Sequence, residues 1–274
     1  MKFITSPAIT RHRSVTHAFL TRIGGVSTGP FASLNFKEHD GDSGDVEENR
    51  ARMGRLLRVD VERLFTVRQV HGDRVVVVES GSEDSSLLHD GERPEGDAIL
   101  TNKKGLAIGV LTADCVPIIL VDPVQEVVGI VHAGWRGTVA GICGKAVTKM
   151  GDHFGSHAED ISAAIGPAIG PCCYEVGEEV AVHFRTGLFQ EKEVVVQIND
   201  GRLQLDLQKA NQLLLLESGV EDCNISISPF CTSCSSDLFF SYRRDGAPTG
   251  RQLSFVVMEE APNDEGELEE EESP

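Results

Sequence analysis

The sequence predicts one α/β or α+β domain built around a large mixed β-sheet. Short segments rich in β-branched residues fill the first half of the chain, and helical periodicity appears between strands in the second half. No repeat or linker divides the chain, and 274 residues with 40% hydrophobic content can bury a sizeable core. We expect this domain to occupy residues 1–258, with residues 259–274 forming an acidic, solvated tail.

The predicted strands are short and bounded by Gly, Pro or Asp. They are His17–Arg22, Leu64–Val70, Arg74–Glu79, Asp97–Thr101, Leu106–Thr112, Val116–Asp122, Val127–His132, Ile161–Ile165, Glu193–Ile198 and Asn224–Ser228. The polar stretch Gly81–Gly96 is expected to be an exposed loop. These segments supply enough strands for a large sheet.

The hydrophobic period changes from two to about 3.6 near Gly137, which predicts a helix. Thr138 is a candidate N-cap for it. Further helices are predicted over Val176–Phe184 and Leu207–Leu216, the second ended by Gly219. The apolar face of the first helix would contain Val139, Ile142, Cys143, Ala146, Val147 and Met150.

The formal net charge of −18 is concentrated at the end of the chain, where residues 259–272 carry nine of the 43 acidic residues and no base. The remaining residues lack the basic stripe of a nucleic-acid-binding protein, so we expect no nucleic-acid partner. The first 17 residues lack the apolar core of a signal peptide. The longest apolar run, Gly105–Val121, is broken by Asp114 and Pro117. We therefore expect a cytoplasmic protein with no membrane partner.

Seven cysteines, an odd number, favour free thiols or metal ligands over a disulfide framework in a reducing compartment. Cys231 and Cys234 have Cys-x-x-Cys spacing, but no partner pair accompanies them in sequence, so a structural or incidental role is favoured. Cys172 and Cys173 precede a predicted helix, and only an opposed pocket would make them functional.

Three metal-ligating side chains stand where predicted strands end. His71 follows the segment FTVRQV, Cys115 follows GVLTAD, and His132 ends VVGIVH. Ligand sites gather at such edges because a rigid scaffold holds the loops. Zn²⁺ bound by three protein ligands keeps a fourth position open for water or substrate, as in catalytic sites. Spacing alone also allows a small buried cysteine and satisfied histidines.

The neighbouring residues favour a ligand site. The glycines at 134 and 137 let the backbone approach a ligand closely. Asp114 can orient a ligating imidazole or serve as a turn carboxylate. Trp135 can stack on a flat ring or plug the sheet edge.

Longer motifs carry a resemblance to a known family. TRIGGVSTGPFASLNF, ENR, QVHGDRV, DAILT, LTADCVPIILVDP, HAGWRG, AIGPAIGPCCYEVG, LDL and FFSYRRDGAPTGR occur in the order seen in the bacterial multicopper polyphenol oxidase (laccase) family. That family includes the peptidoglycan editing factor and zinc-dependent purine nucleoside phosphorylases. The resemblance covers roughly Thr16 to Arg251, with HAGWRG and TADC as its most specific motifs. It implies an α/β sandwich of mixed sheets with helices outside, and it places the zinc ligands, which are also the catalytic residues, at His71, Cys115 and His132.

The activity implied by the resemblance is phosphorolysis of adenosine, inosine and methylthioadenosine, with adenosine deamination as a side activity. The partners would be a nucleoside and phosphate, and substrate contacts are expected at Asn35, Arg50, Asp114 and Arg136. Arginine suits phosphate because its planar fork binds two oxygens. The other candidate arginines are Arg22, Arg243, Arg244 and Arg251.

Copper-dependent phenol oxidation is less favoured, although Cu²⁺ is the alternative metal. None of the nine histidines forms a His-x-His pair, and one mixed site cannot hold the copper ions of a multicopper oxidase. Two other readings stay open: a hydrolase of peptidoglycan precursors with Cys115 as a nucleophile activated by His132, and a zinc-stabilised binding module. The sequence leaves both a monomer and a homodimer open.

Overall fold

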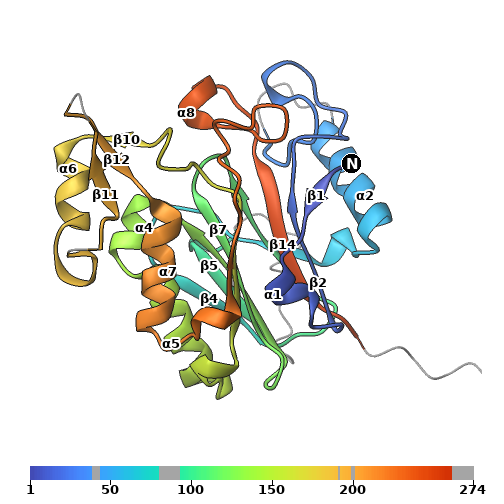
Figure 1. Ribbon diagram of the computed structural model, residues 1–274. Helices are drawn as coiled ribbons and strands as arrows, with labels where there is room; N and C mark the ends of the chain where they lie inside the picture. The colour runs from blue at the N-terminus through green and yellow to red at the C-terminus, as the bar shows by residue number, and fades with distance from the viewer. Residues whose placement is uncertain (39–43, 80–92, 191, 199–200, 261–274) are drawn as a thin grey trace, which may run out of the picture.

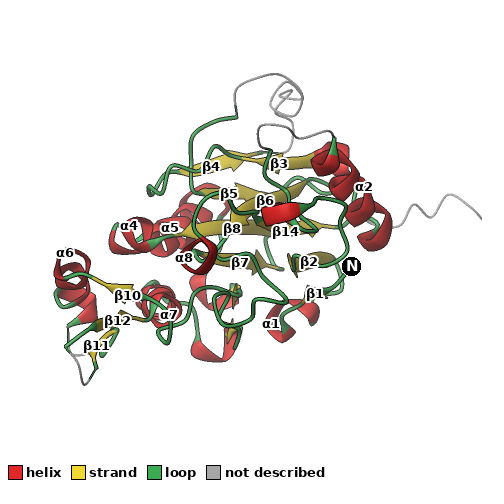
Figure 2. Cartoon of the chain, turned by 90° about the horizontal axis from the view of Figure 1, so that it is seen from above, coloured by secondary structure: helices red, strands yellow, loops and turns green. Residues whose placement is uncertain are grey.

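The computed structural model describes residues 1–38, 44–79, 93–190, 192–198 and 201–260. Two large β-sheets pack face to face, and helices cover the outer face of each sheet (Figures 1 and 2). The structure confirms the predicted mixed α/β fold and the sandwich that the family resemblance implies.

The first sheet has five strands, and its outer face carries a helix. Its order is β1 (Phe3–Ile4), β2 (Val15–Leu20), β14 (Gln252–Met258), β6 (Ala107–Thr112) and β3 (Leu64–Thr66). Only the pair formed by β3 and β6 is parallel among these described strands. The helix α2 (Asp45–Leu57) packs on the outer face through Met53 and Leu57.

The second sheet has six strands and contains the most apolar part of the chain. Its order is β13 (Ile225–Ile227), β9 (Ser162–Ile165), β7 (Val116–Asp122), β8 (Val127–Ala133), β5 (Ala98–Thr101) and β4 (Val75–Val78). Successive side chains of β7 point to opposite faces: Ile118 contributes to the core under the helices, and Ile119 to the core between the sheets. Burial on both faces explains why β7 and β8 are continuous apolar runs.

Helices α5 (Ile142–Phe154) and α7 (Leu207–Glu217) cover the outer face of this second sheet. Smaller elements complete the fold: α1 (Pro7–Thr10), α4 (Trp135–Val139), α6 (Glu178–Ala181), α8 (Tyr242–Asp245), and an antiparallel sheet of β10 (Glu175–Val176), β12 (Leu203–Leu205) and β11 (Val195–Gln197). Single 3₁₀ turns occur at Gly29–Phe31, Val61–Arg63, Ala158–Asp160, Val182–Phe184, Gly187–Phe189 and Asp222–Asn224. None of the helices in the described part of the chain combines the length and hydropathy that crossing a membrane requires.

The structure corrects the predicted helix after Gly137. The chain forms two helices there, because Gly141 has a φ of 75° and separates α4 from α5 as the N-cap of α5. Thr138 lies inside α4 and does not cap a helix; its hydroxyl donates to the carbonyl of Gly134 at 2.9 Å. Val139 is 36% exposed, so it is not on the buried face, whereas Ile142, Cys143, Ala146, Val147 and Met150 are buried as predicted.

Several other boundaries differ from the prediction. The segment Leu64–Val70 is a strand only to Thr66, and Val176–Phe184 is a short helix followed by a 3₁₀ turn. Of the elements longer than six residues, two were missed along with several short ones. The helix α2 has few buried residues, so its sequence shows a weak apolar stripe. The strand β14, buried along its whole length, pairs with β2 and β6.

Two predictions fall largely outside the described residues: the exposed loop at Gly81–Gly96, of which only residues 93–96 are described, and the acidic tail beyond residue 260. The division into a domain of residues 1–258 and a tail stays a prediction.

Candidate metal centre and active site

The three predicted ligands meet at one edge of the six-stranded sheet. His132 lies near the end of β8, Cys115 immediately precedes β7, and His71 lies in the connection from β3 to β4. The β3–β4 and β6–β7 connections both cross from the five-stranded to the six-stranded sheet. They run together because Gln69 and Leu111 exchange two hydrogen bonds, of 2.8 and 2.9 Å. The parallel pairing of β3 with β6 therefore brings His71 next to Cys115.

The candidate ligand atoms of His71, Cys115 and His132 all lie within 4.8 Å of one another. The two imidazole rings are nearly perpendicular, with centroids 4.8 Å apart. His132 is buried, Cys115 is half-buried and His71 is exposed, so the group opens toward solvent on one side. This convergence is what the sequence analysis required of a shared site.

Asp97 organises the group, and the sequence analysis did not single it out. Its fully buried carboxylate pairs with Nδ1 of His132 at 2.8 Å and accepts the backbone N–H groups of His71 at 2.9 Å and Gly72 at 2.7 Å. Burial opposes its ionisation, but these hydrogen bonds hold the pKa of Asp97 below its ordinary value. One carboxylate thus fixes both histidines and leaves Nε2 of His132 free to ligate. The sequence signal was the position of Asp97 directly before the strand AILT.

The thiol and the buried imidazole change each other's protonation. Burial alone would raise the pKa of Cys115, but His132 and then His71 outweigh burial and lower it to about 6. Burial alone would lower the pKa of His132, but the Cys115 thiolate and then Asp97 raise it to about 9. At neutral pH the protein therefore presents a thiolate, the form in which cysteine binds metals, beside a protonated His132, and a metal ion would displace the proton on Nε2 when it binds there.

The glycines of HAGWRG are explained by close approach rather than by backbone conformation. A Cβ atom on Gly134 would lie 3.2 Å from both Sγ of Cys115 and Cδ2 of His71. A Cβ atom on Gly137 would lie 2.7 Å from the carbonyl oxygen of Gly72. Side chains at these positions would push the His71 loop away from β8, so the motif keeps the group compact.

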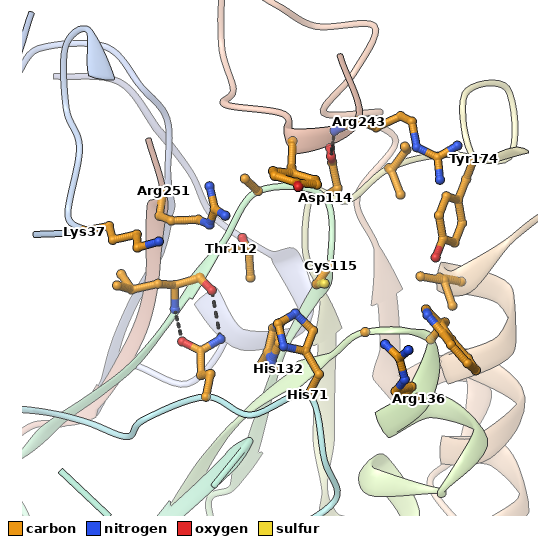
Figure 3. Close-up of a pocket in the computed structure, with 18 of the residues that line it drawn as sticks. Lys37, His71, Thr112, Asp114, Cys115, His132, Arg136, Tyr174, Arg243 and Arg251 are labelled. Carbon is orange, nitrogen blue, oxygen red and sulfur yellow. Dashed lines mark hydrogen bonds between the residues drawn. The ribbon is translucent and has the colours of Figure 1, made fainter. Parts of the chain in front are cut away.

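The group lies on the wall of a pocket of about 660 Å³, a volume typical of small-molecule sites. Lys37 and Arg251 lie on one side of the group, and Arg136, Tyr174 and Arg243 lie on the other (Figure 3). Burial and then Cys115 raise the pKa of Tyr174 to about 12, so its hydroxyl remains a donor at neutral pH. The cationic residues of the lining are Lys37, Arg93, Arg136, Arg243 and Arg251.

Asp114 lines the pocket, but its carboxylate does not orient a histidine. Its carboxylate accepts a hydrogen bond from the hydroxyl of Thr232 at 2.6 Å. It also accepts the backbone N–H of Arg243 at 2.7 Å (Figure 3). Asp114 has a φ of 98°, and its side chain holds the loops around Thr232 and Arg243. The orienting role that the sequence analysis considered for Asp114 belongs to Asp97.

Asn35 supports the pocket from behind. Its side chain is fully buried, and its amide accepts the backbone N–H groups of Lys37 at 3.1 Å and Arg251 at 2.9 Å, and donates to the carbonyl of Lys37 at 2.7 Å. These bonds place two of the cationic residues at the pocket. Asn35 therefore positions groups that can touch a substrate, and its predicted direct contact stays a prediction.

The candidate arginines separate into two groups. Arg136 lines the pocket with its guanidinium 4.4 Å from the ring of Trp135, and Arg243 and Arg251 also line it. Arg50 is not part of the lining and pairs with Glu38 at 3.6 Å. Its predicted substrate contact remains untested. Arg22 and Arg244 bond to backbone carbonyls and so hold loops together.

A sequence model of the family described as multi-copper polyphenol oxidoreductase laccase matches residues 16–259. The chain belongs to this laccase family. The match confirms the resemblance inferred from the motifs, and it covers the six-stranded sheet, the five-stranded sheet apart from β1 and the first residue of β2, and the three candidate ligands.

Relatives in the laccase family carry enzyme names. Purine nucleoside phosphorylase YlmD of Geobacillus stearothermophilus is 42% identical over 243 residues, which are 88% of this chain and 89% of that protein. Adenosine deaminase RL5, from an unknown prokaryotic organism, is 38% identical over 243 residues, 87% of this chain and 92% of that protein. The crystal structure of the Bacillus licheniformis hypothetical protein YfiH matches with a TM-score of 0.86 at 37% identity, covering 94% of this chain and 99% of that one.

Proposed function

We propose that this protein is a zinc-dependent purine nucleoside phosphorylase. The observation that carries the proposal is the position of His71, Cys115 and His132 between cationic and aromatic walls of one pocket. The name of the Geobacillus relative, which shares most of this chain, supports the same activity. We also propose a cytoplasmic location, because none of the seven cysteines, all of which lie among the described residues, is paired in a disulfide.

The three side chains suit a zinc ion. One thiolate and two imidazoles are preferred zinc donors, and Asp97 holds His132 in the tautomer that ligates through Nε2. Zinc bound there would act as a Lewis acid beside the substrate. Copper accepts the same donors, but the two clusters found among the described residues contain only two histidines, too few for a multicopper centre.

Phosphorolysis needs a place for an anion beside the sugar. In the reaction, a phosphate oxygen bonds to C1′ of the ribose while the bond to the purine nitrogen breaks and its electron pair leaves with the base. Lys37 and Arg251 stand on one side of the ligand group, with their backbones fixed by Asn35. Their positive charges would hold phosphate for attack and balance its charge.

The opposite wall suits the purine. The Trp135 ring stacks with His183, and the guanidinium of Arg136 lies over the Trp135 ring. Together these groups offer a flat surface on which a purine ring could stack. The Tyr174 hydroxyl points into this side of the pocket and remains protonated. Arg136 and Tyr174 would stabilise the negative charge that develops on the departing base.

The decisive assay follows inosine cleavage by the zinc-replete protein with and without phosphate. We expect hypoxanthine and ribose 1-phosphate in equal amounts, and no cleavage without phosphate. Arg251→Gln should raise the KM for phosphate about tenfold, the loss of one charge-assisted hydrogen bond. Arg55→Gln is the matched control, since Arg55 is an exposed arginine of α2 that pairs with Glu48. Base release that is independent of phosphate would overturn the proposal.

Adenosine deamination is the second candidate, supported by the name of the RL5 relative. Here water adds to the purine carbon that bears the amino group, and ammonia leaves. The same pocket would present the base to the ligand group. Adenosine incubated without phosphate should yield inosine and ammonia; their absence at high enzyme concentration would remove this activity.

A further inference from the structure

A second cluster of metal-ligating side chains lies away from His71, Cys115 and His132. It consists of Cys172, Cys173, Cys231 and Cys234, and its four sulfur atoms all lie within 4.8 Å of one another. Two loops supply the cluster, one before β10 and one before α8. The two pairs are almost 60 residues apart in the sequence, so only the fold shows that they lie together.

The sulfur geometry suits a common ion better than two disulfides. Sγ of Cys234 lies 3.6 Å from Sγ of Cys172 and 3.3 Å from Sγ of Cys173. Four thiolates around zinc at about 2.3 Å place neighbouring sulfurs about 3.8 Å apart, whereas a disulfide needs about 2.05 Å. The observed separations are close to the first value.

A backbone N–H already donates to one of the four sulfurs. The N–H of Gly170 donates to Sγ of Cys231 at 3.2 Å. Such donors stabilise the negative charge of a ligating sulfur. The guanidinium of Arg244 donates to the carbonyls of Thr232 and Ser233, the two residues inside the Cys-x-x-Cys turn. The turn is therefore fixed without help from a ligand.

We propose that Cys172, Cys173, Cys231 and Cys234 bind one zinc ion in a closed, structural site. Four sulfur ligands complete a tetrahedron and leave no position for substrate. This inference does not rest on the proposed phosphorolysis, because it requires only the four thiols and their positions relative to one another. It assigns to these cysteines a joint role that neither sequence pair showed alone.

The site would lock one wall of the pocket. Its first loop leads directly to Tyr174, and its second contains Thr232, whose hydroxyl bonds to Asp114 at 2.6 Å. The loops also meet through a hydrogen bond from the N–H of Thr232 to the carbonyl of Ala168 at 2.9 Å. A zinc ion joining both loops would fix Tyr174 and Arg243, whose guanidinium lies 5.1 Å from the Tyr174 ring.

The test uses the full chain and counts metal. Purified protein should contain two zinc ions per chain. Cys115→Ala removes the only sulfur from the group of His71, Cys115 and His132. When the zinc of this variant is exchanged for Co²⁺, any thiolate-to-cobalt absorption therefore comes from the four-cysteine cluster. We expect one equivalent of cobalt with the strong visible bands of tetrahedral thiolate coordination.

Adding Cys172→Ser or Cys234→Ser to that background should remove or shift those bands and lower cobalt affinity at least tenfold. Cys223→Ser is the matched control, because Cys223 is an exposed thiol outside both clusters. If a serine variant does not fold, the zinc count and the cobalt spectrum of the Cys115→Ala protein decide alone. Three results would overturn the proposal. They are the absence of thiolate-to-cobalt bands in the Cys115→Ala protein, iron bound in place of zinc, and disulfides found by mass spectrometry of the freshly purified chain.

Discussion

The two cysteine-containing clusters differ in number of ligands and in surroundings. The group of His71, Cys115 and His132 has three candidate ligands on the wall of a pocket, and a buried carboxylate orients it. The four-cysteine cluster has four candidate ligands, all exposed or half-buried, and the backbone N–H of Gly170 donates to one of its sulfurs. Three ligands leave room for a reactant and four do not. The comparison predicts that changes to the first group alter turnover, whereas changes to the second alter the shape and stability of the pocket wall.

The largest expected effect comes from Cys115→Ala. This change removes the thiolate of the three-ligand group, and we expect kcat/KM for inosine to fall more than about 100-fold, since even supporting residues of such sites cost 10–100-fold. Cys223→Ala should leave kcat/KM unchanged. Steady-state phosphorolysis measures both. Equal activity of the two variants would contradict the assigned division of roles.

A smaller loss is expected for Asp97→Asn, because Asp97 acts through His132 and the His71 loop. An amide offers the imidazole a weaker partner, and we expect metal affinity or kcat to fall about 10–100-fold. Asp122→Asn is the control, since Asp122 is equally buried at the opposite end of β7 and, among the described residues, accepts hydrogen bonds only from the nearby backbone N–H groups of Val124 and Gln125. A loss of zinc affinity in Asp122→Asn as large as in Asp97→Asn would indicate general destabilisation.

Thr232→Val tests the link between the two clusters. It removes the hydroxyl that donates to Asp114 and leaves a nearly buried carboxylate oxygen without that partner, which should cost about 1–3 kcal/mol of unfolding free energy. The KM for inosine should rise a few-fold as the wall loosens. Thr249→Val is matched, because the buried Thr249 hydroxyl has no hydrogen-bond partner among the described residues. Denaturant titration and kinetics should separate the two variants.

Substitution of His17 is expected to have the smallest effect on activity, because His17 is a buried histidine with a structural role. Burial lowers the pKa of His17 to about 4, and its Nε2 accepts the N–H of Ser6 at 2.8 Å. Between pH 6.5 and 4 the unfolded chain binds a proton that the folded chain does not, so this contribution is complete above pH 6.5 and is lost as the pH falls toward 4. The loss amounts to about 3 kcal/mol.

Replacing His17 with Gln keeps a hydrogen-bond acceptor but removes the titration. Unfolding free energy measured from pH 7 to pH 4 should therefore fall less steeply in His17→Gln than in the unaltered chain, while inosine turnover stays the same. His157→Gln, at an exposed position, should keep the original slope. A parallel decline in all three proteins would show that His17 titrates normally when folded.

Sequence reasoning predicted the three candidate ligands that the fold brings together, but it did not predict the residues that position them. Asp114 was the obvious candidate to orient a histidine because it precedes Cys115, yet its positive φ is accompanied by bonds to Thr232 and Arg243. Asp97 takes the role because antiparallel pairing sets the start of β5 beside the end of β8. Neighbours in sequence need not share a face, and strand register decided which carboxylate meets His132.

The four-cysteine cluster also shows that spacing in the sequence does not reveal which residues meet in the fold. The Cys-x-x-Cys spacing was visible, but its meaning depended on Cys172 and Cys173, which a bridge between Ala168 and Cys231 brings alongside. Likewise, Tyr174 and Arg93 gave no sequence signal of their own. They became pocket residues because loops distant in sequence meet at one sheet edge.

The sequence by itself determined β7 and β8, because burial on both faces requires continuous apolar runs, and it placed Cys115 just before β7 and His132 near the end of β8. The tertiary structure alone decided which groups meet. Crossovers between the two sheets set His71 beside Cys115, and strand register set Asp97 beside His132, because backbone hydrogen bonding fixes distances that spacing along the chain leaves free.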